Sequence, residues 1–170
     1  MTYLGQRGRL WLKAIHVFFA CIWTGTVLCL LTLSIAQPVP QSSDELSGYF
    51  TAVTLLETAL IPLGAGGCVL TGLGFSCLTK WGFVTFWWIL VKWVGTITVM
   101  IAGASFGGRL LHLSRELLAR DGFAVLHNPT LRSYQTIMAI LKPVNAIILC
   151  VLFFLSYVKP WGVRTSKKRP

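Results

Sequence analysis

Four ionisable side chains of this sequence lie inside otherwise apolar stretches, where they could do chemistry. They are His16, Glu57, Lys92 and Lys142. An ionisable group is costly inside a membrane, so each of them should face protein, a cofactor or water rather than lipid. Histidine can bind a metal or carry a proton, and a carboxylate beside an ammonium group can form an ion pair or part of a proton pathway.

His16 is open to two interpretations. Its neutral imidazole can form a hydrogen bond between two helices, or it can be an axial ligand to the iron of a haem. A second histidine at the same depth is missing, because His112 and His127 belong to a more polar segment. A haem on His16 would therefore take Lys92, a methionine, water or a second chain as its sixth ligand. Two stacked haems, which electron transfer across a membrane needs, do not fit this sequence.

The two lysines and the glutamate also fall at matched depths. Lys92 should lie at about the depth of His16 on another helix, although its long side chain could instead extend to the nearby interface. Glu57 and Lys142 should share a depth nearer the other side, which predicts an ion pair or a hydrogen-bond network that could include Asn145. Such a pair would either hold helices in register or belong to a proton or substrate pathway.

The composition indicates a small polytopic membrane protein. Of the 170 residues, 55% are hydrophobic and 12% are charged, and the mean hydropathy is +0.70. This leaves no room for a separate aqueous domain. The net charge of +10 could suggest nucleic acid, but the basic residues gather at the ends of apolar stretches and no nucleic-acid-binding motif accompanies them. We therefore expect the lipid bilayer, and not nucleic acid, as a partner.

The apolar stretches predict an all-α, integral membrane four-helix bundle that forms a single domain over residues 1–170. Each stretch supplies the roughly 20 apolar residues that a helix needs to cross a bilayer. The predicted spans are residues 12–34, 49–78, 84–108 and 134–158. A helical extension outside the membrane is expected over residues 109–133, because leucines continue there at helical spacing among charged residues.

Local signals place the breaks and the close contacts. Pro62 should kink the second helix, Gly122 should end the third, and Asn128 followed by Pro129 should begin the fourth. Glycines remove side-chain bulk, so another helix or a flat ligand can approach the backbone closely. We expect helix packing at the glycines of the second and third stretches, which are Gly64, Gly66, Gly67, Gly72, Gly74, Gly103 and Gly107.

The distribution of basic residues predicts that both termini are cytoplasmic. Nine lysines and arginines flank the side with the termini, and four flank the other side, which satisfies the positive-inside rule in the cytoplasmic (inner) membrane of a cell. An aromatic belt should mark the same interface, made of Trp11, Trp81, Trp87, Trp88 and Trp161. Ser34-Ile35-Ala36 resembles a signal-peptide cleavage site, but the preceding apolar stretch is longer than the 7 to 15 residues of such peptides.

Other chemistries have little support. The five cysteines all lie in apolar stretches without a CxxC pair, so most should be small buried hydrophobic residues rather than disulfide partners or metal ligands. The sequence contains no Ser-His-Asp, Walker, HExxH or dinucleotide-binding pattern. Hydrolytic, nucleotide-driven and zinc-protease functions are therefore not indicated.

Two sets of motifs resemble membrane protein families. WLKAIH, followed by a Trp-Thr-Gly segment, resembles the opening of small families that include the HemJ-type protoporphyrinogen oxidases and the CopD-like domains. LTGLGFSCLTKWGFVTFWWILVKW and SYVKPWG resemble an uncharacterised family of four-helix bacterial membrane proteins. Together these resemblances cover about half of the chain.

HemJ-type proteins bind haem, and two of their positions match here. Their first-helix histidine corresponds to His16, and their W-x-x-x-K segment corresponds to Trp88 to Lys92. The resemblance implies a b-type haem bound by His16 and Lys92. The HemJ segment after the first helix, with an arginine and a further histidine, is absent where this chain has residues 28–37, and this departure concerns the oxidase activity more than the haem.

We therefore expect a membrane protein that binds one b-type haem or porphyrin through His16, with a redox or haem-handling role. The alternative is a membrane protein without a cofactor, acting as a subunit, a scaffold or a small transporter that uses Glu57 and Lys142. A second copy of the chain or another membrane protein would be a fitting partner in either case.

Overall fold

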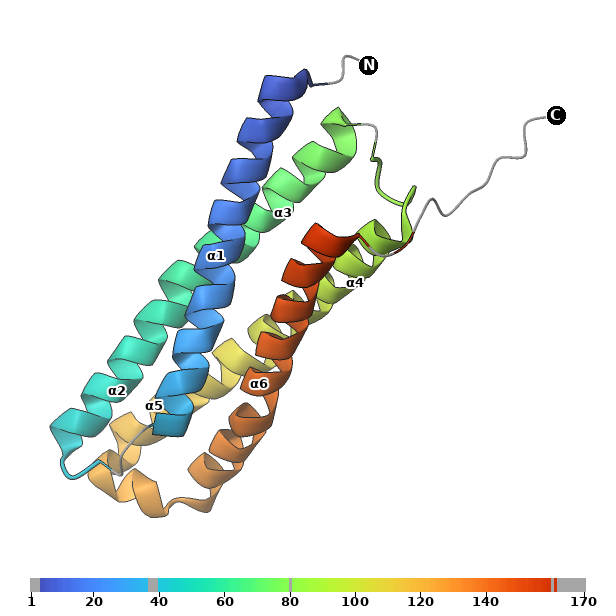
Figure 1. The fold of residues 1–170 in the computed structure, drawn as a ribbon. Helices are drawn as coiled ribbons and strands as arrows, with labels where there is room; N and C mark the ends of the chain where they lie inside the picture. Colours follow the sequence, from blue (N-terminus) through green and yellow to red (C-terminus); the bar gives the residue numbers. More distant parts are fainter. Residues whose placement is uncertain (1–3, 37–39, 80, 160, 162–170) are drawn as a thin grey trace.

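The computed structural model consists of long helices and describes residues 4–36, 40–79, 81–159 and 161. Four helical rods follow one another along the chain (Figure 1). Their parts are α1 (Gln6–Ala36); α2 (Ser43–Leu55), η1 (Leu56–Leu60) and α3 (Ile61–Leu78); α4 (Trp87–Ala102), η2 (Gly103–Gly108), α5 (Arg109–Asp121) and η3 (Gly122–His127); and α6 (Pro129–Val158). All four rods are long and apolar enough to cross a membrane.

The helix ends follow from local capping chemistry. The hydroxyl of Ser42 accepts from the backbone N–H of Glu45 at 3.2 Å and begins α2. The side chain of Asn128 accepts from the N–H of Thr130 at 2.9 Å and begins α6. Gly122, at φ 56°, ends α5 in a conformation that favours glycine. The predicted stop at Gly122 and the predicted start at Asn128 are confirmed.

Some helices begin outside the predicted spans. α1 begins at Gln6 and α6 begins at Pro129, several residues before the apolar stretches do. Helical hydrogen bonding continues into these flanks because no residue there breaks it. The helix of the third rod begins later than residue 84, at Trp87, since Gly82 turns the chain at φ 62° and Phe86 is extended.

Two wide π turns interrupt the second and third rods. The sequence predicts a kink near Pro62, and the structure has a π turn there, η1, which ends two residues before the proline. Proline lacks the N–H that an α-helix needs at this point, and a wider turn accommodates the missing bond. The second π turn, η2, contains Gly103 and Gly107, where an added Cβ would meet nothing within 4 Å. Within the described part of the chain, these two glycines therefore pack against no other helix.

Two glycines of α3, Gly64 and Gly67, pack closely against α1. A Cβ on Gly64 would lie 2.7 Å from the backbone nitrogen of Trp23, and a Cβ on Gly67 would overlap the ring of Phe19. Because α1 also packs on α6, and α6 on α4, the four rods are arranged in the order α3, α1, α6, α4. The main core between them consists of Trp23, Val27, Ala65, Cys68, Val99, Ala146 and Leu149.

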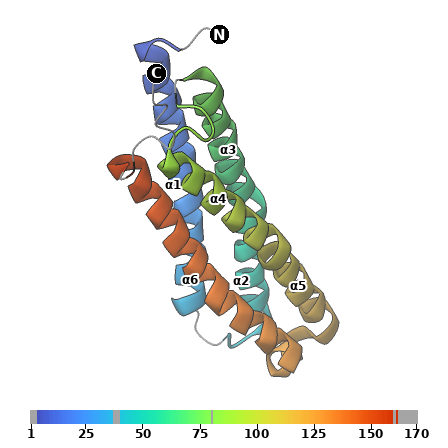
Figure 2. The same cartoon turned by 90° about the vertical axis from the view of Figure 1, so that its right-hand side faces the viewer.

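A second, smaller core closes the end of the molecule at which α2 begins and α5 ends, which we call the α2–α5 end. The third rod lies beside α6 along α4 and reaches α2 along α5 (Figures 1 and 2). There α2, η3 and α6 bury four apolar side chains, Leu46, Phe50, Val125 and Leu131. This core fixes α2 relative to the beginning of α6.

The outer surface is strongly apolar, as lipid contact requires. Large hydrophobic side chains along every rod are exposed. Three of the five cysteines, Cys21, Cys29 and Cys77, are exposed on this surface, whereas Cys68 is buried and Cys150 is half-buried. The expectation that most cysteines are buried is therefore wrong, because apolar stretches in a membrane protein face lipid as often as protein.

Candidate functional site

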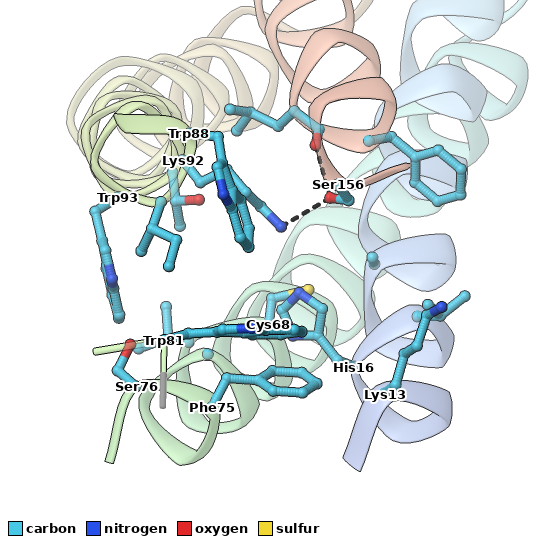
Figure 3. A pocket seen from close by; sticks show the side chains of 18 of the residues that line it. Lys13, His16, Cys68, Phe75, Ser76, Trp81, Trp88, Lys92, Trp93 and Ser156 are labelled. Carbon is cyan, nitrogen blue, oxygen red and sulfur yellow. Dashed lines mark hydrogen bonds between the residues drawn. The ribbon is translucent and has the colours of Figure 1, made fainter. Parts of the chain in front are cut away.

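A pocket of about 280 Å³ lies between the rods, toward the end at which α3 finishes and α4 begins. We call this the α3–α4 end. All four rods line the pocket, and so does the turn that joins α3 to α4. Figure 3 shows His16 from α1 and Lys92 from α4 on its wall, together with several aromatic rings. The two residues that the sequence placed at one depth therefore line one cavity.

Thr71 on α3 is the hydrogen-bond partner of one ring nitrogen of His16. The Nδ1 atom of His16 lies 2.6 Å from Oγ1 of Thr71. The same hydroxyl lies 2.6 Å from the carbonyl oxygen of Gly67. When the hydroxyl proton is donated to Gly67, Nδ1 of His16 is the donor to Thr71, and the lone pair of the neutral ring is on Nε2.

The Nε2 atom of His16 has no hydrogen-bond partner among the described residues. The ring makes an edge contact with Phe75, with centroids 5.7 Å apart and planes at 86°, and otherwise belongs to the pocket wall. Histidines that bind metals usually donate their other N–H to a neighbouring oxygen in this way. The sequence left two alternatives for His16, a hydrogen bond between helices and a bond to the iron of a haem. His16 could do both, one through each ring nitrogen.

Lys92 lies on the wall of the pocket. Its Nζ donates to the hydroxyl of Ser156 at 2.7 Å, and Ser156 donates to the carbonyl of Leu152 at 2.8 Å. The ammonium group lies 6.0 Å from the ring centroid of Trp88. It is also close enough to His16 to interact with it electrostatically. An ammonium group and an imidazole ring therefore share one cavity.

Tryptophans that the sequence assigned to an interface belt form part of the pocket. Trp81 stacks on Phe75, with centroids 5.4 Å apart and planes at 28°, and touches the edge of Trp88. The ammonium of Lys159 lies 5.0 Å from the Trp81 ring centroid and 5.7 Å from that of Trp88. Sequence reasoning missed this role of Trp81, Trp88 and Lys159. Trp11, Trp87 and Trp161 are exposed, as a belt requires.

The charge around the pocket has one sign. Three lysines line it, Lys13, Lys92 and Lys159, and no carboxylate does. All five acidic residues of the chain lie elsewhere, on the η1 segment and around the α2–α5 end; they are Asp44, Glu45, Glu57, Glu116 and Asp121. The pocket therefore favours a ligand that is largely apolar and carries negative charge at its edge.

Glu57 and Lys142 lie apart from the pocket, near the α2–α5 end. In the described part of the chain they form no ion pair within 4 Å, although they interact electrostatically. The Nζ of Lys142 instead donates to the hydroxyl of Ser34 at 2.5 Å. Asn145 takes part in none of these bonds.

The residues described here do not form a site for a bare metal ion. No group of three or more histidines, cysteines or acidic residues is close enough to hold one. A haem needs only one or two axial ligands from the protein, so this finding bears on bare metals alone. No family model, curated protein or solved structure matches the chain.

Proposed function

We propose that the pocket binds one b-type haem or a related porphyrin through His16, with a redox or haem-handling role in the membrane. The observation that carries the proposal is the hydrogen bond between His16 Nδ1 and Thr71, which leaves Nε2 as the ring nitrogen without a partner at the pocket wall. Neutral imidazole with its second nitrogen fixed by a neighbour is the usual axial ligand of haem proteins.

The residues around His16 suit such a ligand. The stacked rings of Phe75 and Trp81 offer a flat apolar surface, and Lys13 and Lys159 offer positive charge for propionates. Lys92 would supply either a further carboxylate partner or a sixth ligand. The pocket, at about 280 Å³, lies just below the range of roughly 300–1,000 Å³ for ligand sites, so a macrocycle would be bound there by its edge. When bound, the iron would supply one-electron redox chemistry.

An absorption spectrum tests the proposal. Protein purified from haem-replete cells should show a Soret band, and His16→Ala should abolish it while leaving expression nearly intact. His112→Ala is the matched control, because His112 is exposed on α5, and it should keep the band. Lys92→Ala should weaken haem retention. Full haem stoichiometry with an unchanged spectrum in His16→Ala would overturn the assignment of the ligand.

The family and location form part of the same proposal. We place the chain with the uncharacterised four-helix bacterial membrane proteins, distantly similar to the HemJ-type and CopD-like families, in the cytoplasmic membrane with both termini inside. Oxidase activity is not included, since the HemJ segment after the first helix is missing. A colourless protein from haem-replete cells would favour the alternative of a subunit, scaffold or small transporter without a cofactor.

A further inference from the structure

Two walls of the pocket belong to helices that do not pack closely on each other, α3 and α4. Both helices line the pocket over two turns, through Val69, Gly72 and Ser76 on α3 and through Ile89, Trp93 and Thr96 on α4. We propose that the pocket takes up its ligand from the lipid bilayer, through the gap between α3 and α4 that the side chain of Trp93 covers. The inference rests on the proposed function, since it concerns the ligand of the same pocket, and it adds that this ligand is an amphiphile dissolved in the membrane.

The gap between α3 and α4 is closed at its two ends and not along its length. At one end a short segment of chain joins Leu78 to Trp87, and at the other end α2 packs against α5 and η3. Between these ends α3 packs on α1, whereas α4 packs on α6 (Figures 1 and 2). Both rods are apolar enough to lie in a membrane, and the residues that follow Gly72 and Trp93, which are Leu73 and Val94, are exposed and apolar. Lipid rather than water should therefore lie outside the gap.

The side chain of Trp93 bridges the gap. A Cβ on Gly72 would lie 3.9 Å from the Trp93 ring, so the ring reaches α3 at a residue that has no side chain. Figure 3 shows Trp93 extending from α4 toward the side of the pocket on which Ser76 lies. The ring stacks on Phe83, with centroids 6.0 Å apart and planes at 28°. The cover of the gap is thus a half-buried ring held by a second ring, and Phe83 is itself exposed.

The aromatic ring at the α3–α4 end of the pocket is held more firmly than Trp93. Trp81 stacks on Phe75, meets the edge of Trp88 and has the ammonium group of Lys159 5.0 Å from its ring centroid. Within the described part of the chain, Trp93 has only Phe83 as an aromatic partner. Displacing Trp93 therefore breaks fewer interactions than displacing Trp81, and the gap is the easier route into the pocket.

The charges that line the pocket fit a ligand that arrives from lipid. Charged groups are costly inside the hydrocarbon, so an anionic amphiphile keeps its charge at the interface and its apolar body among the acyl chains. Such a molecule can pass its body between α3 and α4 while its anionic edge stays near the rod ends. Lys13 and Lys159 line the pocket, and Lys159 directly follows the last residue of α6. A porphyrin with two propionates is a molecule of this class.

Photolabelling from the lipid phase tests the route without any porphyrin. A phospholipid with a diazirine on its acyl chain is mixed into nanodiscs that hold the full-length protein, and labelled residues are identified by mass spectrometry. Trp93→Ala should raise the labelling of Trp88, a buried residue of the pocket wall, several-fold, whereas Ala146 in the main core should stay unlabelled. Trp11→Ala is the matched control, because Trp11 is exposed on α1 and is not among the residues that line the pocket.

Phe83→Ala is a second, milder variant, since it keeps Trp93 and removes only the ring on which Trp93 stacks. It should raise the labelling of Trp88 in the same direction but by less. Labelling of Trp88 that is the same in both variants as in the natural sequence, with the helical circular dichroism spectrum retained, would overturn the proposal.

Porphyrin exchange tests the same route on the proposed ligand. Zinc protoporphyrin is fluorescent, so its transfer from liposomes to the protein, and back to empty liposomes, can be followed over time. Both rates should rise several-fold in Trp93→Ala and stay unchanged in Trp11→Ala. Porphyrin binding with equal rates in Trp93→Ala and the natural sequence would overturn the route. Labelling of Trp88 as expected, in a protein that takes up no porphyrin, would support the route and overturn the proposed function.

Discussion

Thr71 orients the ring of His16 through one short hydrogen bond. Its hydroxyl lies 2.6 Å from Nδ1 of His16 and 2.6 Å from the carbonyl oxygen of Gly67, so Nε2 is the ring nitrogen left without a partner among the described residues. Sequence reasoning found His16 from its position in an apolar stretch, but it could not find Thr71. A threonine in a membrane helix usually bonds to its own backbone, and nothing in its spacing shows that it also serves another helix.

Thr71→Val removes this acceptor while nearly preserving the shape of the side chain. Since neighbours that orient a metal-binding histidine are worth about 10–100-fold in metal affinity, we expect haem affinity to fall by that factor. Haem titration into the apoprotein, followed at the Soret band, measures the change. Thr136→Val is the control, because Thr136 is exposed and bonds only to its own helix at Arg132. Equal affinity in Thr71→Val and the natural sequence would contradict the role of Thr71.

For Glu57 and Lys142, the depth in the membrane can be predicted from the sequence, but the hydrogen-bond partners cannot. Their shared depth is predictable from the apolar stretches, but the bond from Lys142 to Ser34 is not, since a lone serine near a helix end carries no signal. The same holds for Trp81 and Trp88. Because tryptophans are enriched at membrane interfaces, the sequence indicates the depth of Trp81 and Trp88 in the membrane. It does not show in which direction their side chains point, and both line the pocket.

A double-mutant cycle measures the remaining interaction between Glu57 and Lys142. Each single change to alanine should destabilise the protein, because it leaves the other charge without its counterion. The double change should cost less than the sum, by an interaction energy of about 0.5–3 kcal/mol that is typical of neighbouring residues. Chemical unfolding in mild detergent at neutral pH provides the free energies. Strictly additive losses would show that the two residues do not interact.

The contact between α1 and α3 is the tightest feature at the scale of whole elements. The sequence predicts that glycines of the second apolar stretch serve packing, and Gly64 and Gly67 do so. Gly66 does not, although it lies between them in sequence, because it is on another face of the helix. The helix ends at Gly122 and Asn128 were predictable from capping rules, whereas the two π turns were not, since no local rule requires them.

Gly67→Ala should therefore destabilise the bundle, whereas Gly66→Ala should not. A Cβ at Gly67 overlaps the ring of Phe19, and overpacking of this kind costs about 1–3 kcal/mol. A Cβ at Gly66 meets nothing within 4 Å, and alanine gains up to about 1 kcal/mol over glycine in a helix. Thermal unfolding of the two variants in the same detergent measures the difference. A stability of Gly67→Ala equal to that of Gly66→Ala would contradict the described packing.

At the scale of the whole molecule, the number of rods and their all-helical character were predictable, because apolar stretches of this length admit few other structures. The arrangement of the rods was not. The order α3, α1, α6, α4 leaves the pocket between the two rods that a short turn connects. Sequence patterns predict which residues form each span, but they do not show which helices that follow one another in sequence are separated by a pocket in the fold.

Reporter fusions test the orientation that the basic residues predict. A reporter fused after Pro170 should be cytoplasmic, and one inserted at Ser42 should be external, because nine lysines and arginines flank the first side and four flank the second. Alkaline phosphatase and fluorescent protein fusions give complementary signals for the two compartments. The reverse pattern would exchange the sides assigned to the pocket and to Glu57.

The π turn η1 sets the angular phase between two halves of one rod. Leu46 and Phe50 on α2 must face the small core with Val125 and Leu131, while Gly64 and Gly67 on α3 must face α1. Rewinding Leu56–Leu60 as an ordinary α-helix, with all five residues kept, would turn one half by as much as about 100° against the other. Either the small core or the glycine contact would then be lost. The wide turn thus allows α2 and α3, within one rod, to point their packing residues in two directions that a regular α-helix of the same sequence could not combine.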